Sequence, residues 1–252
     1  MIDFIKIPNL PEGKVTTVIC GTDDVEILSY FSRNRISIIK NAPNLGIDPS
    51  VSSHADMAAV HLGGKSIIAD KNQTGLSEKL TDLGMNVVYS ENSPIGDYPS
   101  DIGLNFAFVG DRILGNFNYA DKALLKRIEK YEKLSVKQGY CKCSVLVVNQ
   151  NAIITDDEGI SNKAVANGIE SLLVAKGDIS LDGHPYGFIG GASGKISSDT
   201  VIFFGNIEKH RDFQKINTFL SEHGCTYECT DDGSLRDIGG IIPLCEETEK
   251  IY

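Results

Sequence analysis

Short apolar runs recur along the chain and are separated by turns rich in Gly, Ser and Pro. The spacing of apolar residues within and between these runs predicts a repeating order of two strands, a helix and a third strand. The first strands are predicted to start near residues 54, 101, 140, 184 and 234, at intervals of 47, 39, 44 and 50 residues. A period of this size is typical of repeat folds, so the pattern predicts five copies of one ββαβ unit.

Helical periodicity lies between the strand pairs. Apolar residues spaced by three and four positions predict helices in 75–84, 120–134, 159–170 and 213–224. Short strand signals follow such helices, as in 85–90, 171–176 and 225–229. The predicted order is therefore strand, strand, helix, strand throughout.

The two ends of the chain are expected to share one unit. The fifth copy stops after its first strand, near Pro243 and Leu244, with no room for a helix. The N-terminal segment supplies a strand over 15–20, a helix beginning near Thr22 and Asp23, and a strand over 36–40. Pairing the two ends would remove an open sheet edge.

This pattern predicts an α/β fold, a five-bladed α/β-propeller of ββαβ repeats whose last blade is closed by the N-terminal segment. We expect a single domain that spans residues 1–252. An open α/β sandwich of loosely similar units is the alternative architecture.

Composition and charge narrow the class of protein. The 252 residues include 24 Lys and Arg against 34 Asp and Glu, a net charge of −10, and 41% are hydrophobic. This is typical of a soluble globular protein, and the lack of a basic tract argues against a nucleic-acid surface. No apolar run approaches the length of a membrane span, and the N-terminus lacks the plan of a signal peptide. We therefore expect a cytoplasmic protein whose six cysteines are reduced.

Polar residues gather at the start of the five predicted first strands. They are His54 and Asp56, Asp101 and Asn105, Tyr140 and Lys142, His184 and Tyr186, and Asp237. Burying such groups without a purpose is costly, so a functional cavity is expected there. Its carboxylates favour a cationic small molecule. The alternative is a structural network in which Lys142 and Arg236 neutralise the carboxylates.

The fivefold ββαβ repeat closed by its N-terminal segment resembles the pentein superfamily. These α/β-propellers include arginine and agmatine deiminases, dimethylarginine hydrolases and amidinotransferases, and also ribosome anti-association factors. The resemblance implies a central cavity with a Cys nucleophile, a His acid and base, and carboxylates that bind a guanidinium group.

The family residues match this chain only in part. HADMAAV resembles the family's Gly-Gly-Asp-Val stretch and places Asp56 as a guanidinium-binding carboxylate. GYCKCSVLVV resembles the segment that carries the family His, but Tyr140 stands at the His position. GSLRDIGGIIPL resembles the strand that carries the nucleophile, with Asp237 where the Cys belongs.

Cys143 is the candidate thiol nucleophile. Cys141 and Cys143 are two apart on a predicted strand and would share one face, with Tyr140 and Lys142 on the other. If the cysteines face the cavity, a nearby Lys would lower the pKa of the Cys143 thiol. If the other face lines it, Tyr140 and Lys142 form a polar, cationic site. The alternative is that both cysteines pack in the core.

Other interpretations of the cysteines are weaker. A one-residue change of register would bring Cys245 to the nucleophile position, although it would also turn the thiol to the opposite face. Cys225 and Cys229 lie more than 80 residues from the Cys141 pair, a poor spacing for zinc. We expect no metal and no cofactor.

The string GFIGGASGK over 187–195 lacks the spacing of a phosphate-binding loop. Its glycines more simply allow one backbone to pass close to a neighbour or a ligand. His184 and Tyr186 precede it and are predicted to share a strand face.

Two functional hypotheses follow. The first is a divergent pentein enzyme, a hydrolase or transferase, that acts on a guanidine, an amidine or another small cationic nitrogen compound. His54 or His184 would be its acid and base, and Cys143 its nucleophile. The second is a non-catalytic propeller that binds a small molecule or a partner protein, which the absence of the aligned Cys and His favours.

Overall fold

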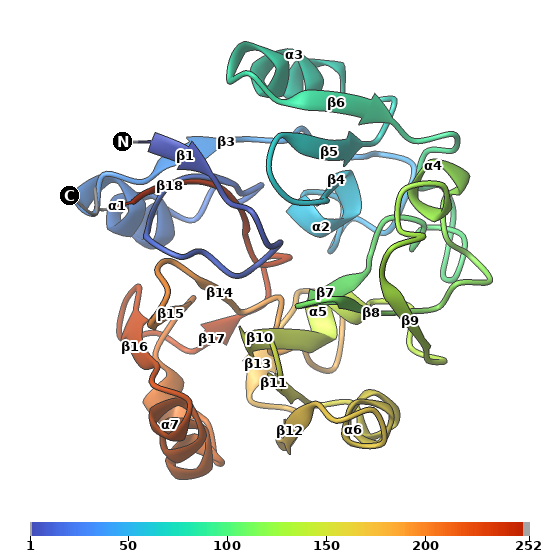
Figure 1. Cartoon of the computed structure of the whole chain (residues 1–252). Helices are drawn as coiled ribbons and strands as arrows, with labels where there is room; N and C mark the ends of the chain where they lie inside the picture. The colour runs from blue at the N-terminus through green and yellow to red at the C-terminus, as the bar shows by residue number, and fades with distance from the viewer. Residues whose placement is uncertain (1, 249–252) are drawn as a thin grey trace.

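The computed structural model describes residues 2–248 as a mixed α/β structure made of many small sheets (Figure 1). Six separate sheets occur in these residues, and five of them share one strand order. In each of the five, the first strand is antiparallel to the second, and the second is parallel to the third across a helical connection.

Four of these sheets follow one another along the chain. The first contains β4 (Ala59–His61), β5 (Ser66–Ala69), α3 (Thr74–Asp82) and β6 (Asn86–Tyr89). The second contains β7 (Ala107–Val109), β8 (Arg112–Gly115), α4 (Lys122–Leu125) and β9 (Glu132–Ser135). The third contains β10 (Val145–Asn149), β11 (Ala152–Thr155), α6 (Glu158–Val165) and β12 (Glu170–Leu173). The fourth contains β14 (Ser193–Lys195), β15 (Thr200–Phe203), the 3-10 helix η1 (Ile207–Lys209), α7 (Phe213–Glu222) and β16 (Thr226–Cys229).

The fifth sheet joins the two ends of the chain. Its strands are β18 (Ile242–Glu247), β2 (Lys14–Ile19) and β3 (Ser37–Ile39), with α1 (Val25–Arg33) between the last two. Strand β1 (Ile2–Phe4) pairs with β18 on the side away from β2 (Figure 1). The pairing of β18 with β2 matches the predicted contribution of the N-terminal segment.

Apolar clusters lie between neighbouring sheets. One cluster joins Leu146 and Ile154 of the third sheet to Val201 and Phe203 of the fourth. Similar clusters join the fourth sheet to the fifth, the fifth to the first, the first to the second, and the second to the third. The long helices α1, α3, α6 and α7 lie at the periphery, whereas the short turns α2 (Ala55–Ala58) and α5 (Cys141–Ser144) lie nearer the middle (Figure 1).

The helix starts follow from their caps. The Asp24 carboxylate accepts hydrogen bonds from the N–H groups of Glu26 and Ile27 and so begins α1, one residue after the predicted Asp23. Asp157 caps α6 in the same way by accepting from Ile160. These bonds satisfy backbone donors that the first turn of a helix leaves unpaired.

The predicted helix over 120–134 is wrong in its second half. Only Lys122–Leu125 is helical, and Glu132–Ser135 forms β9, which pairs with β8. Leu134 is buried in that pairing. A charge-rich segment with apolar spacing looks helical by itself, but the open edge of β8 recruits it as a strand.

The predicted first strands begin too early. Residues 55–58 and 141–144 are single helical turns, and the strands start only afterwards, at Ala59 and Val145. The other first strands begin at Ala107, Ser193 and Ile242. Cys141 and Cys143 therefore do not share a strand face, and His184 and Tyr186 lie outside any strand. Helix nucleation is costly, so a helix of four residues is not stable by itself and depends on tertiary contacts. The local sequence therefore gives no clear signal for it.

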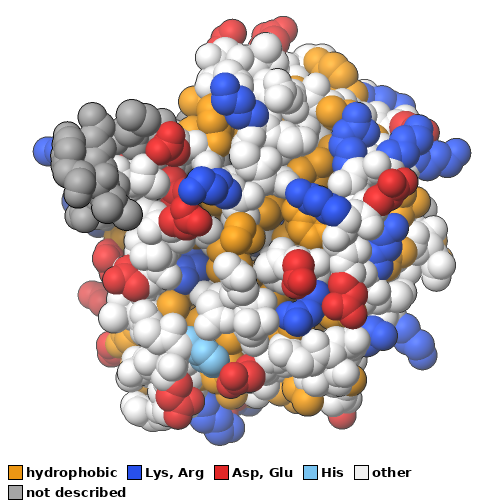
Figure 2. Space-filling model, in the orientation of Figure 1, with side chains coloured by type: hydrophobic (Ala, Val, Ile, Leu, Met, Phe, Trp, Pro, Cys, Tyr) orange, Lys and Arg blue, Asp and Glu red, His pale blue; other side chains and the backbone are white. Residues whose placement is uncertain are grey.

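Three further observations complete the fold. A short parallel pair links β13 (Ile179–Ser180) to β17 (Leu235–Arg236). Within residues 2–248, every helix is too short or too polar to cross a membrane. Basic and acidic side chains are interspersed on the face shown in Figure 2.

Candidate functional site

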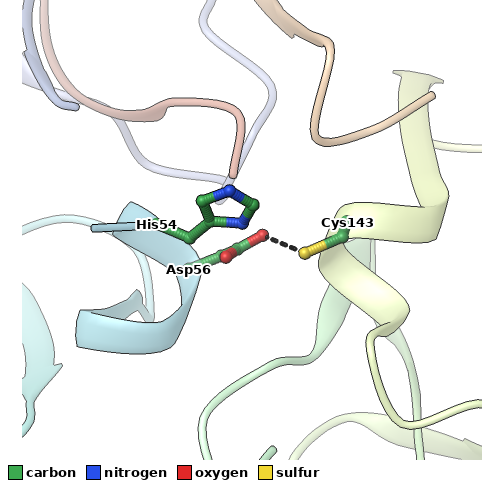
Figure 3. A group of neighbouring side chains, drawn as sticks. All are labelled: His54, Asp56 and Cys143. Carbon is green, nitrogen blue, oxygen red and sulfur yellow. Dashed lines mark hydrogen bonds between the residues drawn. The ribbon is translucent and has the colours of Figure 1, made fainter. Parts of the chain in front are cut away.

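The helical turns α2 and α5 bring three chemically reactive side chains together. His54 stands at the N-terminus of α2, Asp56 lies within it, and Cys143 lies within α5. All three are buried and point toward one another (Figure 3). The Cys143 thiol donates a hydrogen bond to Asp56 Oδ2 at 2.8 Å. The predicted residues of the first and third repeats therefore meet in space.

Asn105 holds the two turns in register. Its Nδ2 lies 3.4 Å from both Cys143 Sγ and Met57 Sδ, and its Oδ1 accepts a bond from the Lys142 N–H at 2.7 Å. Its side chain is fully buried. Asn105 thus contacts both α2 and α5, which fixes the position of the Cys143 thiol.

Asp237 completes the cluster from the last repeat. Its carboxylate accepts hydrogen bonds from the N–H groups of Phe188 and Gly239, at 2.9 and 3.0 Å. Asp237 Oδ1 lies 3.9 Å from His54 Nδ1. A Cβ at Gly191 would lie 1.9 Å from the same Oδ1, so this glycine of the string 187–195 makes room for the carboxylate.

Burial and neighbouring charges shift the pKa values of acidic groups in the cluster. Burial raises the pKa of the Cys143 thiol well above its ordinary value, and the Asp56 and Asp237 carboxylates raise it further. Burial also raises the pKa of Asp56, although His54 and Lys142 oppose this. The negative charges of Asp56 and Asp237 thus disfavour the thiolate form of Cys143.

A cavity of about 240 Å³ opens onto this cluster. The candidates from the sequence that line the cavity are His54, Tyr140, Cys143, His184, Tyr186 and Asp237. It is also lined by Asp48, Val51, Leu181, Pro185 and Phe188. Tyr140, Tyr186 and Phe188 form an aromatic wall, with Phe188 centred 6.4 Å from Tyr140 and 6.0 Å from Tyr186. Such a cavity suits a small molecule with one polar end.

His184 lies at the mouth of the cavity. Its Nε2 lies 2.9 Å from Ser50 Oγ and 3.4 Å from Asp48 Oδ2, and 40% of its side chain is exposed. These contacts link the loop before α2 to the loop before β14. His184 is therefore separate from the buried group formed by His54, Asp56 and Cys143.

Three other residues considered in the sequence analysis do not line the cavity: Asp101, Lys142 and Arg236. Tyr140 donates its hydroxyl to Asp101 Oδ2 at 2.6 Å, so Asp101 supports the wall. Lys142, with Asp56, borders a smaller void on the other side of α2 and α5. Arg236 pairs with Asp24 and Asp231, at 2.9 and 2.5 Å. The alternative network of Lys142 and Arg236 is therefore wrong for Arg236, whereas the positive charge of Lys142 does oppose the rise in the pKa of Asp56.

The other cysteines are dispersed. Cys245 packs in an apolar cluster, Cys141 donates to Gln138 O at 3.1 Å, and Cys225 lies 3.4 Å from Lys195 Nζ. In residues 2–248, His54, Asp56 and Cys143 form the one group of three potential metal ligands that converge. A zinc site that joins the Cys141 and Cys225 pairs, and a nucleophile at Cys245, are both excluded by these positions.

Several lining residues could not be found from the repeats. Asp48 and Val51 belong to a long loop between β3 and α2, and Leu181, Pro185 and Phe188 belong to the segment before β14. Strand periodicity carries no information about such loops. Only Phe188 had a signal, because it lies within the glycine-rich string.

Solved structures show which proteins share this fold. An amidinotransferase of the saxitoxin pathway from Microseira wollei has a TM-score of 0.60 at 10% identity, over 99% of this chain and 98% of that one. Agmatine deiminase from C. jejuni has a TM-score of 0.54 at 12% identity, over 93% and 94%. DDAH from Pseudomonas aeruginosa, complexed with citrulline, has a TM-score of 0.53 at 11% identity, over 87% and 93%.

These relatives are pentein-fold enzymes, so the predicted pentein resemblance is confirmed at the level of the fold. No curated protein matches the chain by sequence. A family model described as a family of unknown function (DUF6873) matches residues 18–242. The chain belongs to this family.

Proposed function

We propose that the chain is a divergent pentein enzyme that acts on a guanidine, an amidine or another small cationic nitrogen compound. The observation that carries the proposal is the buried group of His54, Asp56 and Cys143, of which His54 and Cys143 line the 240 Å³ cavity. The cyclic succession of apolar clusters between the five sheets supports a single domain built as a five-bladed propeller. Structural neighbours named as an amidinotransferase and an agmatine deiminase support the substrate class.

The carboxylates would bind the substrate. Asp56 and Asp237 lie near Cys143, and both raise the pKa of its thiol by their charge. A guanidinium group presents a planar set of N–H donors that suits paired carboxylates. The aromatic wall would pack against the remainder of the substrate. This arrangement would place the central guanidinium carbon beside the Cys143 sulfur.

The reaction would begin at Cys143. Its sulfur forms a bond with the central carbon while the thiol proton passes to Asp56. The bond from that carbon to the departing amine breaks as His54 supplies the amine with a proton. Water or an acceptor amine then attacks the adduct, the carbon–sulfur bond breaks, and the sulfur recovers its proton. Water would make the protein a hydrolase, and an amine would make it a transferase.

The bound cation would also activate the thiol. Without a cation, burial and two carboxylates favour the protonated form of Cys143. A guanidinium placed between these groups adds a positive charge that stabilises the thiolate. The nucleophile would therefore form mainly when the correct charge is bound. His54 suits the acid and base role better than His184, which is held at the mouth by Ser50 and Asp48.

The position of the proposed nucleophile differs from the one that the pentein resemblance implies. Cys143 comes from the third repeat, where the family carries its His, whereas Asp237 stands where the family carries its Cys. The thiol would thus attack from a different side of the cavity. The second candidate function, a non-catalytic binding protein, is favoured by the elevated pKa of the Cys143 thiol.

Turnover of a guanidine panel tests the proposal. Purified full-length protein is incubated with agmatine, arginine and simple alkylguanidines, and the release of ammonia or of a free amine is measured. Cys143→Ser should abolish turnover, and His54→Gln should lower it by about 100-fold or more. Cys229→Ser is the matched control, because that thiol lies outside the cavity.

The outcome separates the two candidates. Turnover that needs Cys143 but not Cys229 supports the enzyme. Saturable guanidine binding without turnover, retained in Cys143→Ser, would support the binding protein instead. Turnover unchanged by Cys143→Ser would contradict the thiol mechanism.

A further inference from the structure

The group of His54, Asp56 and Cys143 has the composition of a metal site. One ligand atom from each residue lies within 4.8 Å of the other two. The set offers an imidazole nitrogen, a carboxylate oxygen and a thiol sulfur. Zn²⁺ accepts all three donor types, whereas Ca²⁺ and Mg²⁺ prefer oxygen alone.

Unpaired polar atoms point to a ligand at the same place. His54 Nδ1 and Asp56 Oδ1 are buried and lack a hydrogen-bond partner within residues 2–248. The two residues are only 4% and 2% exposed. A buried polar atom without a partner is costly, and coordination of His54 Nδ1 to a metal ion would remove that cost at the imidazole.

We propose that His54, Asp56 and Cys143 form a three-ligand site for Zn²⁺ or a similar divalent metal, with the fourth position open to the 240 Å³ cavity. His54 and Cys143 both line that cavity, so water or another small ligand can reach the fourth position. Three protein ligands and one open position are typical of accessible zinc sites. A bound metal would occupy the Cys143 sulfur, so metal binding would exclude the proposed attack of this thiol on a guanidine. Metal binding is measured without a guanidine, so its test does not depend on turnover.

The three donor atoms need to move only slightly to bind a metal ion. Tetrahedral Zn²⁺ with ordinary bond lengths separates its N, O and S donors by roughly 3.4–3.6 Å. Cys143 Sγ and Asp56 Oδ2 now lie 2.8 Å apart because the thiol proton bridges them. Metal binding would form a zinc–sulfur bond and release that proton to solvent, with no change of oxidation state. The sulfur and oxygen would then separate by less than about 1 Å.

Surrounding groups would support the ion. Asn105 Nδ2 lies 3.4 Å from Cys143 Sγ and can donate to a bound thiolate. Asp237 lies 3.9 Å from His54 Nδ1. The charges of the thiolate, Asp56 and Asp237 would be balanced by Lys142 and the divalent ion together. Such outer contacts orient metal ligands and tune their affinity.

The sequence contains no spacing motif for this site. His54 and Asp56 are close in sequence, but Cys143 comes from another repeat. The prediction that the chain has no metal site rested on the lack of such spacing. Only the approach of α2 to α5 makes the combination visible.

Cobalt binding tests the site with the metal alone. Purified full-length protein is titrated with Co²⁺ without any guanidine, and thiolate-to-cobalt absorption in the near ultraviolet is recorded. We expect one Co²⁺ per chain, displaced by Zn²⁺. Cys143→Ser should remove the absorption, whereas Cys229→Ser should keep it. Asp56→Asn should weaken Zn²⁺ binding by at least about tenfold.

The folded state of each variant is checked by circular dichroism, and Asp56→Asn keeps the thiol, so a second variant remains if Cys143→Ser unfolds. No Co²⁺ binding to the wild type would overturn the proposal. Absorption that persists in Cys143→Ser, or Zn²⁺ affinity unchanged by Asp56→Asn, would also overturn it. Because no substrate is present, these results do not depend on whether guanidines are turned over.

Discussion

Asp156 should make the protein less stable as the pH rises. The residue follows β11, it is 3% exposed, and neither carboxylate oxygen has a hydrogen-bond partner within the described residues. Burial raises its pKa from 3.8 to about 7, although Lys176 opposes the shift. The nearby Asp157 and Asp237 act in the same direction as burial.

The direction of the change in stability with pH follows from proton binding to Asp156. Between pH 3.8 and about 7, the folded chain holds a proton on Asp156 that the unfolded chain has lost. The contribution of this residue to stability is therefore complete at low pH and falls as the pH rises through this interval. At about 1.4 kcal/mol for each pKa unit, the loss amounts to at most about 4 kcal/mol.

Asp156→Asn removes this dependence at nearly constant side-chain volume. The difference in free energy of unfolding between the variant and the wild type should be near zero at pH 4. It should then grow to as much as about 4 kcal/mol in favour of the variant at pH 8. Urea denaturation of both proteins across this range measures the difference.

Asp111→Asn is the control, because the Asp111 side chain is 84% exposed and should show a flat difference. A constant difference between Asp156→Asn and the wild type from pH 4 to 8 would refute the reasoning. A difference that grows in the opposite direction would refute it as well.

Two further substitutions, Gly191→Ala and Tyr140→Phe, test the construction of the cavity, and Gly75→Ala is the control for the first. Gly191→Ala places a Cβ 1.9 Å from Asp237 Oδ1; it should cost about 1–3 kcal/mol in urea denaturation and weaken guanidine binding in calorimetry. At Gly75, no atom lies within 4 Å of an added Cβ, so Gly75→Ala should leave the free energy of unfolding unchanged or raise it by up to about 1 kcal/mol. Equal losses of stability in Gly191→Ala and Gly75→Ala would contradict the packing argument. Tyr140→Phe removes the bond to Asp101, so its thermal unfolding should show a loss of about 1–3 kcal/mol, and an unchanged melting temperature would argue against that bond.

Much of the strand, strand, helix, strand order could be predicted from the sequence. Segments such as 67–69 and 152–155 are apolar enough to be recognised as buried strands. Turns that contain Gly or Asn separate each of them from the preceding strand. The cap-like pair Thr22 and Asp23 also placed the start of the N-terminal helix within one residue of its observed cap, Asp24. These features depend on neighbours within a few positions along the chain.

The candidate site was predicted less well, for a physical reason. Asp56, Cys143 and Asp237 were recognised as candidates, but their geometry depends on two helical turns that the local sequence does not encode. The turns are held by contacts between repeats, such as those of Asn105 with Met57 and Cys143. Periodicity of 2.0 residues, applied to 140–144, placed the side chains on the wrong faces. Loop residues such as Asp48 carry no periodic signal at all.

Covalent labelling tests the central claim most directly. The full-length protein is incubated with a haloacetamidine, a cationic reagent that alkylates thiols, and the modified cysteines are mapped by peptide mass spectrometry. The proposed mechanism predicts rapid labelling at Cys143, slowed by a competing guanidine and prevented by Asp56→Asn and Asp237→Asn together. Uniform slow labelling of all six cysteines, or labelling elsewhere while Cys143 stays unmodified, would contradict it.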